Sequence, residues 1–165
     1  MKKMQGSQAV GYSSRKPRKN PTNKPATLPE VFIIESLPRK DNGGVQGKSL
    51  ASALESFGQY PRYRDVATSK ELWKALLEFK ESDYRYLHIS CHGLPGGEGL
   101  VLRNQEEVTF GEFVRHIGGL RLSLRRLFLS ACCAGSCSAL AEALFSNPNS
   151  RAVHSVLAPK EEIDL

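Results

Sequence analysis

Short apolar segments alternate with amphipathic segments along most of this chain, and this alternation limits the possible folds more than any other feature. The segments 31–36, 63–67, 84–90, 124–131 and 151–158 have the apolar, β-branched or aromatic content of strands. Helical spacing of apolar residues marks the stretches between them. Strands that alternate with helices predict parallel pairing through right-handed crossovers. We therefore predict an α/β fold, a three-layer αβα sandwich with a mostly parallel central sheet and helices on both faces.

Four helices are predicted between these strands. Two capping boxes, Thr68 to Glu71 and Thr109 to Glu112, mark the starts of the second and third helices. The predicted apolar faces are Leu50, Leu54 and Phe57 in the first helix, Leu72, Leu76 and Phe79 in the second, Phe113, Val114 and Ile117 in the third, and Leu140, Ala141 and Leu144 in the fourth, at 138–145. A Gly-rich stretch with a short strand from Leu100 to Leu102 precedes the third helix.

The positive charge of the chain is concentrated in its first residues. The net charge is +6, but residues 1–27 contain seven basic residues and no acidic one, so residues 28–165 carry −1. Three prolines and few large apolar residues predict that 1–27 is a disordered tail and 28–165 a single domain. The tail is either a solvated leader or linker, or a weak contact for nucleic acid or an anionic surface. The neutral domain itself is not expected to bind nucleic acid.

The sequence predicts a cytoplasmic protein with reduced cysteines. No apolar run approaches the roughly 18 to 20 residues that span a bilayer, and no apolar segment follows the basic N-terminus as in a secretory signal. We therefore expect no membrane partner. The four cysteines are Cys91, Cys132, Cys133 and Cys137. The last three lie within six residues, which is poor spacing for a disulfide framework.

Two predicted strand ends carry unusual chemistry, Cys91-His92-Gly93 and Cys132-Cys133. The carboxyl ends of parallel strands form the working edge of such a sheet. A cysteine nucleophile needs an imidazole to manage protons and backbone N–H groups to hold the developing oxyanion. We expect His92 and Cys132 to lie just past the ends of their strands. Cys132 would also lie shortly before a helix, which would favour its thiolate. Gly93 has no Cβ, so its N–H can approach a substrate carbonyl, and the N–H of Cys132 is a second oxyanion donor.

These segments resemble the caspase-like cysteine peptidases, and most closely the CHAT-domain family. The residues that carry the resemblance are Tyr86-Leu-His-Ile-Ser-Cys-His92-Gly93 and Leu127-Phe-Leu-Ser-Ala-Cys132, with His92 and Cys132 40 residues apart. The resemblance implies a caspase-like fold in which His92 is the general acid/base and Cys132 the nucleophile. It implies endopeptidase activity through an acyl-enzyme, usually after a charged side chain, without a cofactor.

The resemblance also implies what partners to expect and where this chain departs from the family. A protein or peptide is the expected substrate, a regulatory protein is a further expected partner, and bacterial signalling or defence is the expected setting. Family members usually continue with a strand and helices beyond the point where this chain stops at Leu165. Three hypotheses follow: a fragment, a site that a partner or second copy completes, or an inactive scaffold that binds partners.

Other roles for the cysteines and histidines stay open at this stage. Cys132 could be a buried structural thiol, and Cys133 is its competitor, although a continuing strand would turn it to the other face. Cys91 is expected to pack, or to pair oxidatively with Cys132. A zinc site from the His and Cys residues is the main rival, but the spacing does not match ordinary zinc sites. His88 lies about 13 Å from His92 along a strand, so we interpret it as a hydrogen-bonded core histidine.

Overall fold

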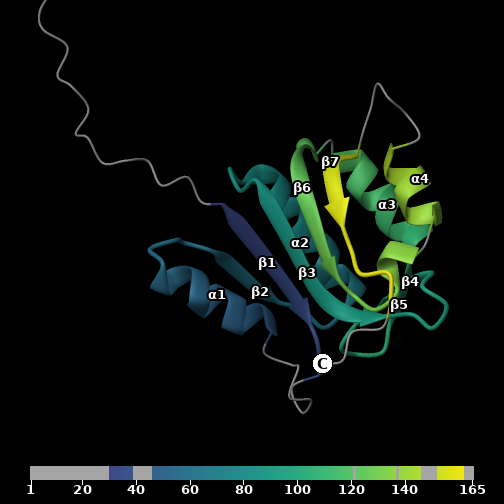
Figure 1. Ribbon diagram of the computed structural model, residues 1–165, viewed down its shortest axis with the longest axis horizontal. Coiled ribbons are helices and arrows are strands. Elements are labelled where there is room, and N and C mark those ends of the chain that lie inside the picture. The colour runs from purple at the N-terminus through teal and green to yellow at the C-terminus, as the bar shows by residue number, and fades with distance from the viewer. Residues whose placement is uncertain (1–29, 39–45, 121, 137, 146–151, 162–165) are drawn as a thin grey trace, which may run out of the picture.

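The protein forms a mixed sheet between layers of helices (Figure 1). A computed structural model describes residues 30–38, 46–120, 122–136, 138–145 and 152–161. Within these residues, five parallel strands lie in the order β2 (Arg62–Asp65), β1 (Val31–Ser36), β3 (Tyr86–Gly93), β6 (Leu122–Ser130) and β7 (Val153–Leu157). Two short strands, β4 (Gly99–Val101) and β5 (Glu107–Thr109), add antiparallel pairing from the carboxyl end of β3. The predicted mostly parallel sheet is therefore confirmed.

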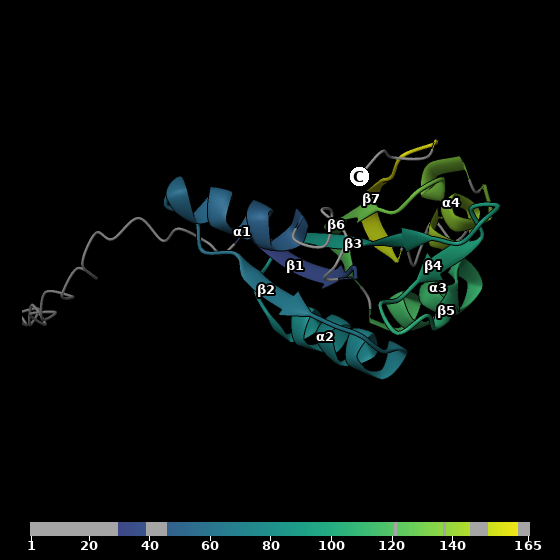
Figure 2. The same ribbon diagram turned by 90° about the horizontal axis from the view of Figure 1, so that it is seen from below.

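Helices cover both faces of the sheet, but unequally. Helix α1 (Gln46–Ser56) lies on one face, over β1, β2 and β3. The described helices of the other face are α2 (Ser69–Glu81), α3 (Phe110–Leu120) and α4 (Ser138–Phe145). Figure 2 shows α1 and α2 on opposite sides of β1 and β2. This arrangement is the predicted αβα sandwich.

The main hydrophobic core lies between the sheet and the three helices of the second face. Strand alternation sends Phe32 and Ile34 of β1 to this face, and the same alternation sends Leu87, Ile89, Leu127 and Leu129 there from β3 and β6. The Phe32 ring meets the Phe79 ring of α2 edge to face, with their centroids 5.6 Å apart. This core holds β3 and β6 side by side, and the candidate base and nucleophile lie at or just past the carboxyl ends of these two strands.

The capping box predicted for α2 is confirmed. The Thr68 side chain accepts a hydrogen bond from the backbone N–H of Glu71 at 3.2 Å, and the Glu71 carboxylate accepts one from the N–H of Thr68 at 3.2 Å. The predicted apolar residues of this helix are buried. In α3, the Thr109 hydroxyl accepts from the N–H of Glu112 at 3.2 Å, which also supports the predicted helix start.

Some predictions about the elements were wrong. Phe57 does not belong to the buried face of α1, because the helix ends at Ser56 and Phe57 is 82% exposed. Strand β3 begins at Tyr86 rather than at residue 84 and continues to Gly93. Strand β5 was not predicted, because three residues carry too little periodicity to be distinguished from a loop.

A buried carboxylate ties α1 and β2 to β1. Glu35 is 1% exposed, and its two oxygens accept hydrogen bonds from the N–H of Gly47 and the hydroxyl of Tyr63, both at 2.7 Å. Burial, followed by the hydrogen bond to Glu35, raises the pKa of Tyr63 above its ordinary value. The hydroxyl therefore keeps its proton and remains a donor to the carboxylate.

Replacing Tyr63 by phenylalanine is expected to lower the free energy of unfolding by about 1–3 kcal/mol, because it leaves a buried carboxylate oxygen without this donor. Urea unfolding of the Tyr63→Phe protein measures the change. Tyr60→Phe removes the same hydroxyl from a residue that is 68% exposed, and it should change stability by less than about 0.5 kcal/mol. Equal effects of the two substitutions would contradict the stabilising role of this hydrogen bond.

Candidate active site

His92 is the second-last residue of β3 and does not lie in the loop beyond it. Strand β4 pairs with this end of β3 in antiparallel register, with His92 opposite Val101 and Gly93 opposite Leu100. This pairing keeps the backbone extended through Gly93, so the prediction that His92 lies just past the strand end was wrong. Pairing with β4 determines where β3 ends, and the local sequence around His92 does not specify this pairing.

Cys132 lies beside this end of β3. Strands β3 and β6 pair in parallel, with Ser90 opposite Ser130, and Cys132 is two residues beyond Ser130 as His92 is two beyond Ser90. A Cβ added to Gly93 would lie 2.1 Å from the carbonyl oxygen and 3.1 Å from the nitrogen of Cys132. The backbones of Gly93 and Cys132 are therefore in direct contact. The Cys132 peptide occupies the space that a Cβ on Gly93 would fill. The sequence suggested only that a substrate would need this space.

The chain turns sharply after β6. Strand β6 ends at Ser130, and Cys133 has a backbone φ of 57°, in the left-handed region. Cys133 does not point to the other face of a continuing strand, as was predicted, because the strand ends at Ser130. A short 3-10 turn, Ala134–Ser136, separates Cys132 from α4, which spans Ser138–Phe145 as predicted.

The residues after β7 support this turn from outside. The N–H of Cys133 donates to the carbonyl of Glu161 at 3.1 Å, and the N–H of Gly135 donates to that of Pro159 at 2.6 Å. A Cβ on Gly135 would lie 2.4 Å from the carbonyl oxygen of Ala158. This contact could not be predicted from the sequence, because backbone hydrogen bonds between distant segments leave no side-chain signature.

The Gly-rich loop that follows His92 packs on the same turn. Gly97 has a φ of +75°, and a Cβ there would lie 2.9 Å from the carbonyl oxygen of Cys133 and 3.2 Å from the hydroxyl of Ser136. Glu98, the one acidic residue of this loop, is exposed. The loop after the candidate base and the turn that holds the candidate nucleophile are thus packed together as one unit.

His88 and the metal hypothesis can be assessed from the same strands. The Nε2 atom of His88 lies 2.9 Å from the Ser90 hydroxyl, as expected for a hydrogen-bonded histidine. Burial lowers the pKa of His88, and the Glu35 carboxylate opposes this effect. Among the described residues no group of three or more His, Cys, Asp or Glu side chains is placed to hold a metal ion. Cys137 lies outside the described residues.

Cys91 faces the hydrophobic core and is 2% exposed, in keeping with the packing role expected for it. Burial, with the neighbouring Cys132 charge as the second cause, raises the pKa of the Cys91 thiol from 9.0 to about 12. The folded protein therefore retains this proton over a pH range in which the unfolded chain loses it. Stability that depends on the neutral thiol is fully present below pH 9 and is lost as the pH rises towards 12.

The stability difference between the wild type and Cys91→Ala is expected to shrink as the pH rises from 9 to 12, by about 1.4 kcal/mol per pH unit. The other titrating groups are common to both proteins, so the difference isolates this thiol. Urea unfolding at three pH values in the lower part of this range measures it. A difference that does not change with pH would contradict the raised pKa.

Comparison with known proteins places these observations in a family. The sequence matches the family model of the CHAT domain over residues 12–146. A search of the curated proteins found no match. No helix in the described part of the chain has the length and apolar character needed to cross a membrane.

Proposed function

Because this chain belongs to the CHAT domain family, a caspase-like family whose members are usually peptidases, we propose that it is a cysteine endopeptidase with Cys132 as nucleophile and His92 as general acid/base. The contact between the backbones of Gly93 and Cys132 is the observation that carries the proposal. It means that the residue after the base and the nucleophile itself are neighbours at the carboxyl edge of the sheet. Such proximity is what a nucleophile and its base require.

The proposed reaction has two steps with balanced proton transfers. The imidazole of His92 takes the thiol proton of Cys132 as the sulfur attacks the peptide carbonyl, and it then gives this proton to the leaving amine. The C–N bond breaks and an acyl-enzyme remains on the sulfur. Water then attacks the acyl carbonyl while His92 takes a proton from the water. The Cys132 sulfur leaves and receives that proton from His92. The products are a carboxylic acid and an amine, and no cofactor is required.

The oxyanion that forms in each step needs donors, and we propose the backbone N–H groups of Gly93 and Cys132 for this role. The β4 pairing and the packed glycine loop support the proposal, because both restrain the backbone around these groups. Donors that are held in place before the reaction stabilise the developing charge without the cost of reorganising. The proposed substrate is an extended peptide segment of a protein.

Selective alkylation tests this assignment directly. Limiting iodoacetamide at neutral pH, with the adduct located by peptide mass, is expected to modify Cys132 faster than Cys91 or Cys133. The reaction at Cys132 should slow by about tenfold or more in His92→Ala, because the imidazole no longer accepts the thiol proton. Cys133→Ala is the matched control, since it removes the adjacent, equally half-buried thiol and should leave the Cys132 rate unchanged.

Uniform, slow labelling that does not depend on His92 would contradict the peptidase proposal. The family fold would then be better explained as a non-catalytic module that binds a protein partner, which is the alternative function. The alkylation experiment needs no knowledge of the substrate, so a negative result cannot be attributed to testing the wrong peptide.

A further inference from the structure

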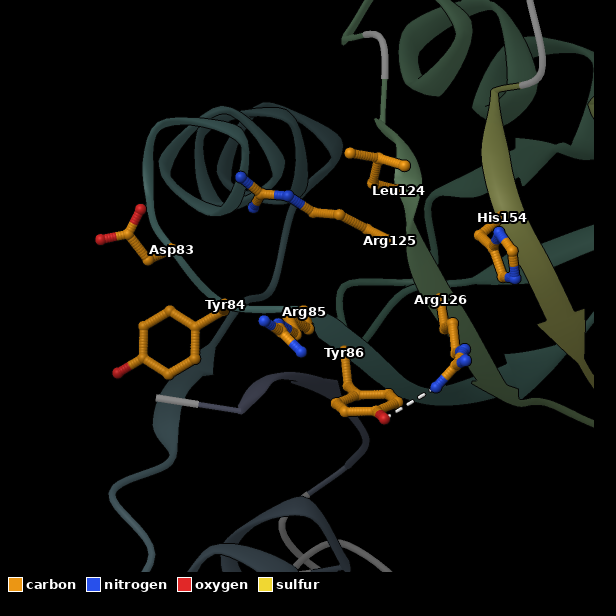
Figure 3. A pocket seen from close by; sticks show the side chains of 8 residues that line it. All are labelled: Asp83, Tyr84, Arg85, Tyr86, Leu124, Arg125, Arg126 and His154. Atoms are coloured by element: carbon orange, nitrogen blue, oxygen red, sulfur yellow. Dashed lines mark hydrogen bonds between the residues drawn. The ribbon is translucent and has the colours of Figure 1, made fainter. Parts of the chain in front are cut away.

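A pocket of about 420 Å³ lies at the amino ends of β3 and β6, at the opposite edge of the sheet from His92 and Cys132. It is lined by Asp83, Tyr84, Arg85, Tyr86, Leu124, Arg125, Arg126 and His154 (Figure 3). The volume is in the range of small-molecule sites and is too small for a folded partner. The proposed peptidase chemistry makes no use of this pocket.

The pocket is strongly basic. Three arginines and one histidine face a single carboxylate, that of Asp83. Elsewhere in the described part of the chain, Arg62, Arg64 and Arg103 form ion pairs with carboxylates. None of the arginines of the pocket forms such a pair with a described residue. Asp83 interacts with Arg125 and neutralises only part of the positive charge, so an anion would gain by binding there.

One of the three guanidinium groups has a structural role. Arg125 donates to the carbonyl groups of Phe79, Lys80 and Ser82 at the carboxyl end of α2, and its guanidinium lies 4.6 Å from the centre of the Phe79 ring. These contacts add donors to carbonyls at the end of the helix and hold the guanidinium in place. Arg125 therefore forms the fixed wall of the pocket and contributes charge from a rigid position.

The other two guanidinium groups lie where a ligand can reach them. Arg85 directly precedes β3 and Arg126 lies on the adjacent strand β6, and the N–H of Arg126 donates to the carbonyl of Arg85 at 3.0 Å. Both side chains are exposed. Tyr86 orients Arg126. The Tyr86 hydroxyl accepts a hydrogen bond from Nη1 of Arg126 at 2.8 Å, and the guanidinium carbon of Arg126 lies 5.5 Å from the centre of the Tyr86 ring. The Arg85 side chain forms no hydrogen bond with another described residue, and Figure 3 shows it on the other side of Tyr86 from Arg126.

We propose that this pocket binds a phosphorylated small molecule whose phosphate is held by Arg85 and Arg126. Both guanidinium groups line the pocket, one on each side of Tyr86, and each can donate two parallel hydrogen bonds to phosphate oxygens. Arg125 and His154 complete the basic surroundings on the β6 and β7 side. The ligand is either a nucleotide, which the remaining volume accommodates, or a simple pyrophosphate-like anion, and the two share the same phosphate chemistry.

Isothermal titration calorimetry on the full chain with AMP and with inorganic pyrophosphate tests the proposal. We expect saturable binding of one molecule for at least one of the two, weakened about tenfold or more by Arg126→Glu and by Arg85→Glu. Tighter binding of AMP would identify a nucleotide site, and tighter binding of pyrophosphate a site for the phosphate groups alone. Lys48→Glu is the matched control, because it makes the same charge change at an exposed position on α1 and should leave binding unchanged.

The proposal is overturned if neither ligand gives saturable heat, or if Lys48→Glu weakens binding as much as Arg126→Glu does. Thermal unfolding of each variant establishes that it is folded. Arg126→Gln and Arg85→Gln replace the glutamate variants if those do not fold, since they remove the charge and keep most of the side chain. These outcomes are independent of alkylation at Cys132, so the two proposals can fail separately.

Discussion

Replacing Cys132 by alanine is expected to lower kcat/KM for peptide cleavage by at least about a thousandfold, because the proposed acyl-enzyme cannot form without the sulfur. His92→Ala should cause a loss of similar size, since the nucleophile and its base act as one unit and their effects do not add. The measurement is cleavage of a proteome-derived peptide library, read by mass spectrometry, followed by initial rates on the best-cleaved peptide.

Cys133→Ala is the control for this experiment. Cys133 is adjacent to Cys132 and has a similar exposure, but its backbone is turned to a φ of 57°. Cleavage by this variant should stay within about threefold of wild type, because most substitutions outside the reacting groups have small effects. Cleavage that survives in Cys132→Ala and disappears in Cys133→Ala would show that the nucleophile has been assigned to the wrong cysteine.

Gly93→Ala is expected to damage the site through the backbone. The added Cβ would lie 2.1 Å from the carbonyl oxygen of Cys132, a distance that no rotamer change can relieve. One of the two strand ends must move, so both the alkylation rate of Cys132 and the peptidase rate should fall by about a hundredfold. The free energy of unfolding should fall by about 1–3 kcal/mol, as in other overpacked sites.

Gly118→Ala is the matched control for Gly93→Ala. Gly118 lies in α3, and a Cβ there would meet no atom within 4 Å. Alanine favours a helix over glycine by about 0.8–1 kcal/mol, so this substitution should stabilise the protein slightly and leave Cys132 reactivity unchanged. A Gly93→Ala protein with wild-type stability and wild-type alkylation would mean that the contact between β3 and the Cys132 peptide is not close in solution.

Much of the fold follows from short-range features of the sequence. The buried run of β1 is marked by adjacent apolar residues, and the start of α2 by Thr68 and Glu71, three positions apart. The proposed dyad could also be predicted, because His92 lies at the end of one apolar strand, Cys132 lies just past another, and strand ends of one parallel sheet meet at one edge. Each of these signals lies within a few residues, which is the range over which periodicity and capping act.

Only the tertiary structure decided how the site is supported. Strand β4 determines that His92 is part of β3, and the carbonyls of Pro159 and Glu161 hold the turn after Cys132. The basic pocket likewise depends on the backbone contact between Arg85, just before β3, and Arg126 of β6. These contacts join residues separated by many positions and use backbone groups that every residue possesses. The sequence by itself therefore determined the elements and the chemistry at their ends, whereas packing decided which backbone groups meet there.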